Sequence, residues 1–415
     1  MKFSIGKTFV LGLGFFGVSV IWSVYNAFVP AFLEEKFLVT AGFIGMFMTL
    51  DNIAALFIQP AVGSWSDRLR TSIGRRMPFI LVGAPVAAIA FTILPVASSL
   101  MLFFLAALAL LLSMAVWRTP VVALMPDITP SKYRSQGNGI INFMGGLGAI
   151  IAFLGGAKLY EMNPSYPFLL GAALVAVSAI LVFVFIKEPK EFAAPSKNQP
   201  GFFESLQTIL ADKDKSALRI LLAIFAWFIA YNGIEAFFTL YAKNHLGLTI
   251  ADGSRLLGQL SLFFVLFSLP AGYIGAAIGR RKTILSGILL MTVCIITIFL
   301  LPVGTLTNVL TKLPVVGEVP VIGLILMVVG IGWALININS LPMVVDMTDA
   351  SRIGTYTGLY YLFSTLAAIS GPILYGWVVQ LSGNQYNLLM MISPIALIAA
   401  AVLTFGVKRG EAKTS

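Results

Sequence analysis

The chain has 415 residues, of which 59% are hydrophobic and only 11% are charged, and its mean hydropathy is +0.95. A soluble globular protein usually carries about a quarter charged residues. This composition therefore excludes a soluble globular protein and indicates that most of the surface faces lipid. The net charge of +10 does not indicate nucleic-acid binding, because the basic residues follow the membrane topology described below.

Twelve apolar runs predict twelve transmembrane helices, since a bilayer core of roughly 30 Å needs about 20 apolar residues per helix. In chain order the runs are 8–33, 40–65, 78–97, 100–126, 136–158, 167–187, 219–243, 252–277, 283–303, 319–345, 354–380 and 387–407. The runs do not alternate apolar and polar residues, so barrel strands are excluded. The predicted fold class is an all-α membrane protein. The first run is read as a retained helix, because no small-residue cleavage site closes it.

The basic residues predict the orientation of these helices. Most of the 27 Lys and Arg residues lie in the segments that would share one side of the membrane with the amino terminus. This positive-inside bias predicts that both termini are cytoplasmic. We therefore expect an integral protein of the plasma (inner) membrane, with the lipid bilayer as its surroundings. We also expect it to be monomeric.

One polar stretch, 188–218, divides the chain into six runs and six runs. Its prolines and mixed charge are typical of a cytoplasmic linker, so the predicted domains are 1–187 and 219–415. The halves echo each other: WSVYNAFVPAF in run 8–33 corresponds to WFIAYNGIEAFF in run 219–243, and the Gly-Arg-Arg string after the second run occurs in both halves. Two pseudo-symmetric six-helix bundles around a midplane cavity are how many secondary transporters are built.

The residues that an enzyme would need are scarce in this sequence. It holds one cysteine, Cys294, and one histidine, His245, and it lacks the usual nucleophile, zinc and nucleotide-binding motifs. We therefore predict no catalytic residue, no metal site and no cofactor. Transport driven by ATP on this chain alone is equally unexpected.

A dense group of charges follows the second run, in the string QPAVGSWSDRLRTSIGRRMPFIL. Arginines at headgroup level and an aspartate that can pair with them or cap a helix suit a cytoplasmic gate. Asp127 and Asp346 end the fourth and tenth runs within reach of basic loops, and salt bridges are their favoured role. The predicted gate residues are Gly63, Asp67, Arg68, Gly74, Arg75, Arg76, Asp127, Arg280, Arg281 and Asp346.

These motifs resemble the major facilitator superfamily, whose signature loop between the second and third helices has this pattern. The longer string is similar to the sucrose–proton symporters of the glycoside–pentoside–hexuronide group. The resemblance implies a twelve-helix secondary transporter and a sugar cargo.

Three departures from that pattern bear on the coupling ion and the gates. An arginine of the sucrose branch is replaced by Val122, and Arg118 stands one helical turn deeper. Ala55 and Gln59 stand where the sodium-coupled branch places acids, which favours protons. In the second half Ala276 replaces the loop aspartate, so the two loops are not expected to be equivalent gates.

Three ionisable residues lie inside predicted spans, where they are functional candidates by default. Asp51 and Glu235 stand about 24 Å from the inner face and Arg118 stands near the midplane, at about 1.5 Å per residue. An acid from each half and one arginine satisfy what proton coupling requires. Desolvation raises the pKa of a carboxyl group and a nearby cation lowers it, so a change in either can switch the acid between its protonated and ionised forms. The alternative is a permanent ion pair that only ties helices together. Asp51 is preferred as the proton carrier.

A sugar site needs neutral hydrogen-bonding groups and aromatic faces. The predicted substrate-binding residues are Tyr25, Asn26, Asn52, Tyr231, Asn232, Asn337, Asn339, Tyr360 and Tyr361. Each of them alone could instead form a helix–helix hydrogen bond worth about 1 kcal/mol. Tryptophans such as Trp333 could stack on sugar rings or pack in the core.

The sequence therefore predicts proton-coupled symport of a glycoside or disaccharide by alternating access, with a small-molecule substrate and a proton as its partners. The alternatives are the same fold with another cargo, such as a drug or an organic anion, and a membrane protein that does not transport, such as a sensor or a membrane-embedded enzyme.

Overall fold

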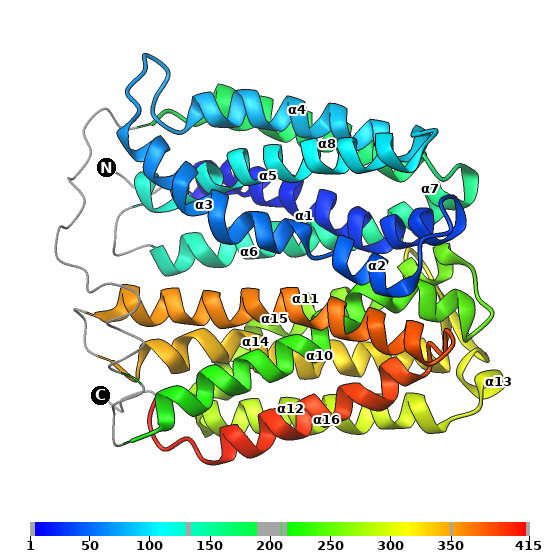
Figure 1. The fold of residues 1–415 in the computed structure, drawn as a ribbon. Coiled ribbons are helices and arrows are strands. Elements are labelled where there is room, and N and C mark those ends of the chain that lie inside the picture. Colours follow the sequence, from blue (N-terminus) through cyan, green and yellow to red (C-terminus); the bar gives the residue numbers. More distant parts are fainter. Residues whose placement is uncertain (1–4, 130–133, 189–208, 210–213, 349–351, 412–415) are drawn as a thin grey trace. The chain divides into compact units, whose positions relative to one another are not determined.

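The computed structural model describes residues 5–129, 134–188, 209, 214–348 and 352–411. Twelve helices in this described part are long and apolar enough to cross a membrane, and each coincides with one of the predicted runs (Figure 1). The all-α fold with twelve spans is therefore confirmed.

The first half contains α1 (Ile5–Glu35), α2 (Ala41–Phe47), α3 (Leu50–Arg68), α4 (Met77–Val96), α5 (Leu100–Ile128), α6 (Arg134–Ile150), the π-helix η2 (Ile151–Gly155), α7 (Gly156–Met162) and α8 (Tyr166–Phe185). Helices α2 and α3 make up the second span, and α6, η2 and α7 follow one another without a break. The second half contains α10 (Ser216–Asn244), α11 (Ile250–Ile278), α12 (Arg280–Leu300), α13 (Val303–Leu306), the strands β1 (Val309–Leu313) and β2 (Gly317–Pro320), α14 (Val321–Val345), α15 (Ile353–Leu381) and α16 (Leu388–Phe405).

The chain forms two compact units. Unit 1 comprises Met1–Val39, Leu50–Ala194 and Thr249–Gly258, and unit 2 comprises Thr40–Thr49, Pro195–Leu248 and Gln259–Ser415. The predicted domains were continuous in sequence. Here, unit 1 also includes the beginning of the second span of the carboxy-terminal half, and unit 2 includes the beginning of the second span of the amino-terminal half. Most of the predicted linker 188–218 lies outside the described residues.

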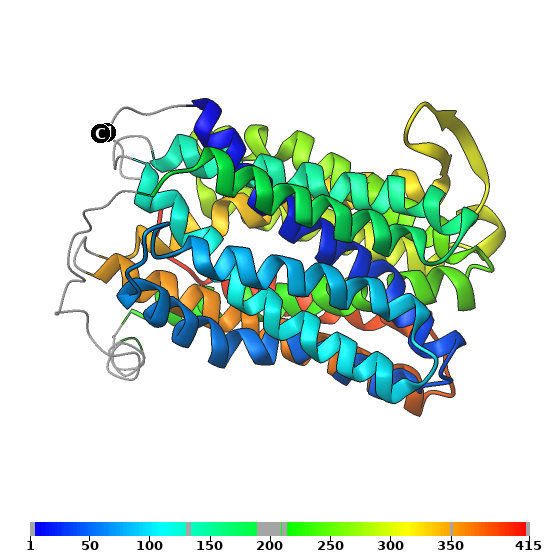
Figure 2. The ribbon, with the colours of Figure 1, turned by 90° about the horizontal axis from the view of Figure 1, so that it is seen from above.

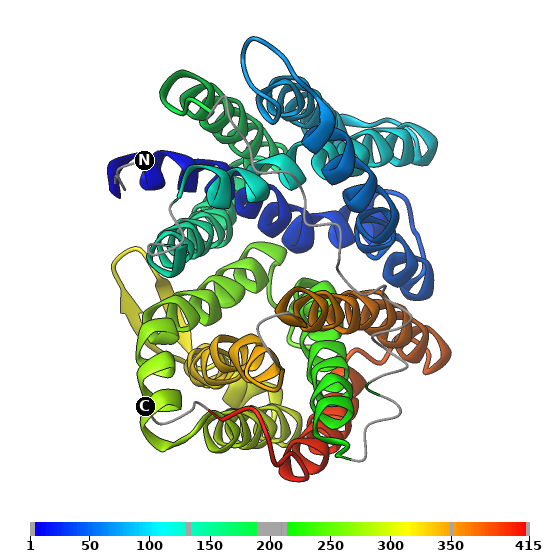
Figure 3. The same ribbon diagram turned by 90° about the vertical axis from the view of Figure 1, so that its left-hand side faces the viewer.

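The same helix pairs pack in both units. In unit 1, α1 contacts α6 and α8, and α4 contacts α5 and α8. In unit 2, α10 contacts α15 and α16, and α12 contacts α14 and α16. Counted by span, the first therefore packs on the fifth and sixth and the third on the fourth and sixth in each unit. Figure 3 shows the spans of unit 2 nearly end-on. This repeated pairing is the structural counterpart of the sequence echo between the halves.

Aromatic side chains fill the core of each unit where these spans meet. In unit 1, the ring of Phe168 on α8 lies 5.0 Å from that of Phe91 on α4 and 6.4 Å from that of Phe28 on α1. In unit 2, the fully buried Tyr375 on α15 packs against Gly233 of α10, and its hydroxyl pairs with Ser393 Oγ of α16 at 2.7 Å.

The second span is not the single helix that the run 40–65 predicted. It is interrupted at Met48 and Thr49, and the Thr49 hydroxyl donates to the carbonyl of Met46 at 2.8 Å. The interruption has a packing cause: α2 packs on α15 in unit 2, whereas α3 packs on α5 in unit 1. The chain changes direction between these two contacts.

Small residues let α2 approach α15 closely. The backbone N–H of Gly42 donates to Gln380 Oε1 at 2.9 Å, and Gly45 lies directly against the carbonyl of Pro372. A Cβ at Gly45 would meet that carbonyl oxygen, so the contact requires glycine. The interruption of the span is thus linked to a backbone approach that larger residues would prevent.

Gly45→Ala should therefore destabilise the protein, by about 1–3 kcal/mol as expected for overpacking, and lower its thermal unfolding midpoint in detergent. Gly358→Ala on α15 is the matched control, because no atom lies within 4 Å of a Cβ built there. That variant should be neutral or stabilising by up to about 1 kcal/mol, through the better helix propensity of alanine. Equal effects of the two variants would contradict the close approach at Gly45.

Candidate functional site

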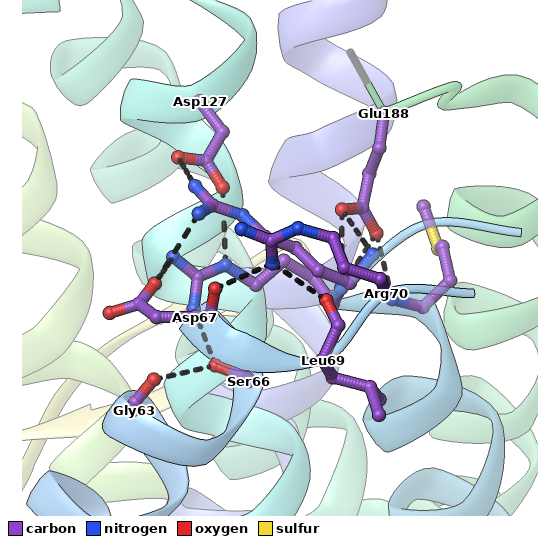
Figure 4. Close-up of polar contacts among 10 residues, drawn as sticks. Gly63, Ser66, Asp67, Leu69, Arg70, Asp127 and Glu188 are labelled. Carbon is purple, nitrogen blue, oxygen red and sulfur yellow. Dashed lines mark hydrogen bonds and ion pairs between the residues drawn. The ribbon is translucent and has the colours of Figure 1, made fainter. Parts of the chain in front are cut away.

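Four charged side chains form a compact cluster at the end of α3 and the start of α4. Arg75 and Arg76 are almost fully buried, with 9% and 4% of their surfaces exposed. Asp127 at the end of α5 accepts from Arg75 Nη2 at 2.7 Å and from Arg76 Nε at 3.1 Å. Asp67 lies 2.6 Å from Arg76 Nη2 and 3.7 Å from Arg75 Nη1. Each carboxylate thus contacts both guanidinium groups, as Figure 4 shows.

The helix ends fix this cluster in place. Arg76 also donates to the buried hydroxyl of Ser66, which in turn donates to the carbonyl of Gly63 at 2.9 Å. Gly63 packs close to Thr119 of α5. The cluster therefore ties α3, α4 and α5 together, and all of these contacts lie within unit 1. Because removing one member of a buried, paired set leaves an uncompensated charge, the four charges depend on one another.

Glu188, which sequence analysis did not select, holds the start of α4. Its carboxylate accepts from the backbone N–H of Arg75 at 2.9 Å, of Arg76 at 2.9 Å and of Met77 at 2.8 Å. The first N–H groups of a helix have no partner within it, and the helix dipole favours an anion there. Gly74, at φ +117°, lies directly against this carboxylate, so both its backbone conformation and the available space require glycine.

Unit 2 repeats part of this arrangement. Gly279, at φ +97°, precedes Arg280, whose side chain pairs with Asp346 and donates to the carbonyl of Pro342 at 2.9 Å. Glu411 accepts from the backbone N–H of Arg280 at 2.6 Å and of Arg281 at 3.1 Å. A carboxylate that follows the sixth span thus caps the third span in both halves. At the place of Asp67, this unit has Ala276.

The remaining gate candidates lie outside these ion pairs. The guanidinium of Arg281 lies 5.3 Å from the ring centre of Phe405. Arg68 is exposed at the end of α3. The predicted pairing of Asp127 and Asp346 with the loop arginines is present in the structure, whereas any role of these contacts in gating stays a prediction.

The segment after α16 also contacts the start of α10. Arg219 donates to the carbonyl of Gly406 at 2.5 Å, and Arg409 Nε lies 2.7 Å from Asp214 Oδ2. Hydrogen bonds from the side chain and backbone of Ser216 hold the pKa of Asp214 below its usual range. Together with Glu411, these contacts fasten residues 406–411 to α10 and α12, and they define this segment as the carboxy-terminal strap.

Asp51, the preferred proton carrier, stands in the first turn of α3, directly after the interruption of the second span. Its Oδ1 accepts from Asn52 Nδ2 at 2.9 Å. The carboxylate is near enough to act electrostatically on Arg118 of α5 and on Tyr25 of α1. The structure therefore brings together four predicted site residues within unit 1.

Two polar groups of α1 lack a hydrogen-bond partner among the described residues. They are the hydroxyl of Tyr25, whose side chain is buried, and the indole N–H of Trp22. The two rings meet edge to face at 5.8 Å. Asn26, the next predicted residue, is half-buried. Buried donors without a partner are costly, so these groups are suited to receive a ligand.

In unit 2 the predicted aromatic residues and Phe228 form a connected wall. The ring of Tyr231 on α10 stacks on Trp333 of α14 at 4.0 Å and 7°. Phe228 meets the face of Trp333 at 5.2 Å and of Tyr360 at 6.4 Å, both edge-on. Glu235, one turn beyond Tyr231, acts electrostatically on it.

Two members of this wall lie on α15. Tyr360 pairs with Ser340 Oγ at 3.0 Å, and the exposed Tyr361 lies edge-on to it at 5.4 Å. We call Phe228, Tyr231, Trp333, Tyr360 and Tyr361 the aromatic wall.

The predicted amides of unit 2 have different surroundings. Asn232 donates to the carbonyl of Phe228 in its own helix at 2.7 Å. Asn339 is buried and donates to the carbonyls of Ala271 and Leu335, both at 3.0 Å. Asn337 is half-buried. The amide N–H groups of Asn232 and Asn339 are therefore engaged with backbone. Of the two, Asn339 forms the helix–helix hydrogen bond that the sequence left as the alternative, whereas Asn232 bonds within its own helix.

Sequence reasoning missed Glu188, Glu411, Ser66, Phe228 and Ser340. A weak signal existed for the first two, because Glu188 and Glu411 are the first acids after the sixth span of each half. Ser66, Phe228 and Ser340 carried none, since a serine or phenylalanine inside an apolar run is ordinary.

Glu188→Ala should lower the free energy of unfolding by about 1–2 kcal/mol, because it removes a helix cap and an anion at the positive helix end. Glu411→Ala should lower the free energy of unfolding by less, since Glu411 is exposed and water can accept the hydrogen bonds of the freed N–H groups. Lys187→Ala, an exposed neighbour, is the control. Thermal unfolding of the purified variants measures all three, and an effect of Lys187→Ala as large as that of Glu188→Ala would contradict the capping role.

The sequence is similar to a known protein family and to several of its members. The profile of the Major Facilitator Superfamily matches residues 11–303 and 256–415. The tetracycline resistance protein, class B, of Escherichia coli is 22% identical over 362 residues, which are 86% of this chain and 84% of that protein. Multidrug resistance protein 1 of Bacillus subtilis (strain 168) is 25% identical over 242 residues, 58% of this chain and 59% of that protein.

A sucrose transport protein of Arabidopsis thaliana is 24% identical over 192 residues, 41% of this chain and 32% of that protein. The chain thus aligns with less than two thirds of the length of two of these three relatives.

Solved structures show the same fold. A bacterial homologue of the human lysosomal transporter Spinster, inward-facing and unoccupied, superposes with a TM-score of 0.74 at 14% identity over 96% of each chain. The nucleoside transporter NupG superposes with a TM-score of 0.74 at 16% identity over 97% of this chain and 100% of that one. With a family profile that matches nearly its whole length and twelve spans in two units of repeated pairing, the chain belongs to the Major Facilitator Superfamily of membrane transporters.

Proposed function

We propose that this transporter carries a sugar of the glycoside or disaccharide class together with a proton. The observation that carries the proposal is the position of Asp51 at the interruption of its span, beside Arg118 and the unpartnered hydroxyl of Tyr25. Discontinuous spans are where secondary transporters place their binding sites.

The coupling step follows from the partners of Asp51. A carboxylate inside a membrane protein stays ionised only while a cation faces it. If cargo engages Arg118, the negative charge of Asp51 loses its counter-ion, and uptake of a proton neutralises it. Loss of cargo on the other side restores the pair and releases the proton. Glu235 in unit 2 is the second acid proposed for this coupling.

Each unit holds groups that a sugar cargo needs. Sugars combine hydroxyl groups with apolar ring faces, so they need hydrogen-bonding groups and aromatic faces. Tyr25, Trp22 and Trp227 supply buried donors without a partner among the described residues, and the aromatic wall supplies ring faces. The sucrose transport protein among the relatives is in keeping with this class.

Export of an apolar drug is the second candidate, and two observations favour it. Several relatives are tetracycline and multidrug resistance proteins. The amides of Asn232 and Asn339 are engaged with backbone, which leaves an environment richer in aromatic than in amide groups. Under this alternative the aromatic wall binds the rings of the drug.

In proteoliposomes, an imposed inward proton gradient should drive accumulation of at least one of a panel of glycosides and disaccharides. Asp51→Asn should abolish accumulation against a gradient but retain exchange of labelled sugar, because the neutral amide mimics the protonated carboxyl. Glu318→Gln, which changes an exposed acid on β2, is the control and should transport normally. Accumulation of tetracycline or cationic dyes with no movement of sugar would support the second candidate instead.

Trp333→Ala should raise the half-saturating concentration of the transported sugar about tenfold, since an aromatic stacking contact contributes about 1–1.5 kcal/mol. Trp65→Ala is the matched control, because Trp65 on α3 is 61% exposed and packs on Phe79 rather than on the aromatic wall. An unchanged half-saturating concentration for Trp333→Ala would contradict a role of the aromatic wall in cargo binding.

A further inference from the structure

The connection between α12 and α14 contains the antiparallel hairpin of β1 and β2. Val309 pairs with Pro320 at its base and Leu313 with Gly317 near its tip. Figure 2 shows the hairpin, in olive-yellow, folded to one side at the end of unit 2, and Figure 3 shows it beside α11. An isolated two-stranded hairpin is marginally stable in water, so this one depends on what it contacts.

The inner side of the hairpin is fixed along the spans. Val316, in the turn, packs with Val319 against Met327, and Leu262 and Phe263 of α11 complete the cluster. The side chain of Gln259 donates to the carbonyl of Glu318 at 2.7 Å.

These contacts set the depth of the hairpin tip. Met327 is six residues into α14, which is about 9 Å along the helix at roughly 1.5 Å per residue. The tip therefore lies alongside the membrane-spanning part of α14 and not above its end.

The outer side of the tip is apolar and strained. Val315 has 89% of its surface exposed and adopts φ +68°. A β-branched residue at positive φ is an outlier, and glycine or asparagine is usual there. In a turn that faces water, valine is disfavoured here for two reasons: its positive φ is strained, and its apolar side chain is exposed. Leu310 and Leu313 are exposed beside it.

Exposed apolar residues also stand on both sides of the hairpin in the chain. Leu300, which ends α12, is 70% exposed, and Leu324, in the first turn of α14, is 50% exposed. Apolar residues at these positions in membrane spans face lipid. The base of the hairpin begins between these two helix ends.

We propose that the hairpin is a lipid anchor, with Val315, Leu310 and Leu313 inserted at the boundary between headgroups and acyl chains of the adjacent leaflet. Full immersion is excluded, because the outer edges of both strands carry backbone groups that hydrocarbon cannot satisfy. Lys312, which pairs with Glu318 at 3.4 Å and is largely exposed, suits the headgroup layer. The hairpin would thus hold the ends of α12 and α14 at a fixed depth.

Collision measurements with a nitroxide label test the proposal. Val315→Cys and Asn384→Cys are each labelled in a Cys294→Ala background, and the protein is placed in phosphatidylcholine–phosphatidylglycerol nanodiscs. Asn384 is the matched control, since it is also exposed, also has positive φ (+65°), and lies in the turn between α15 and α16. Unfolding midpoints check that both variants are folded.

Oxygen concentrates in the bilayer and a nickel chelate in water. We expect the ratio of oxygen to nickel collisions to be several-fold higher at position 315 than at position 384. Equal ratios would mean that the tip is in water, and low collision rates with both reagents would mean that protein covers it. Either of these results would overturn the proposal, independently of whether sugar is the cargo.

Discussion

The organisation of both units depends on a carboxylate at the amino-terminal end of the third span. In unit 1 the three N–H groups that open α4 would otherwise have no acceptor, and Glu188 supplies one from the residues that follow α8. The backbone so fixed presents Arg75 and Arg76 to the two aspartates. Because the cap orients the loop and the loop orients the charges, the cluster cannot be understood from the arginines alone.

The two units share this plan but differ in charge. Unit 2 has the glycine at positive φ, the arginine–aspartate pair and the cap from Glu411. Among its described residues, Ala276 stands where unit 1 has Asp67, and its cap is exposed where that of unit 1 is half-buried. Among the described residues, unit 1 therefore has the larger set of ion pairs around its cap, and the carboxy-terminal strap adds contacts to unit 2. The ion pairs of the two loops differ at Ala276, and the expectation that the loops are not equivalent gates stays a prediction.

The spans could be predicted from their apolar length, and most of the charge cluster from charges that stand close together in residues 67–76. Asp127 could be added because it ends its run within reach of the basic loop. The placement of Asp51 beside Arg118 followed from burial of a charge, which demands a partner. The cap was missed because Glu188 and Arg75 are separated by 113 residues. The interruption at Met48 and Thr49 was missed because it arises from tertiary contacts of Gly42 and Gly45. Whether an asparagine faces a ligand or a backbone carbonyl, as for Asn339, depends on a neighbouring helix that one sequence does not specify.

The exchange of short segments between the two units has a consequence for how the protein is assembled. Residues Thr40–Thr49 pack in unit 2, and Thr249–Gly258 pack in unit 1, where Ser254 donates to the carbonyl of Phe153 in the π-helix and Arg255 pairs with Glu161. A chain cut within 189–208 would give two fragments, each lacking a segment that completes its packing. During synthesis, the packing of unit 1 can therefore be completed only after residues Thr249–Gly258 have been made. Until then the amino-terminal half lacks this segment.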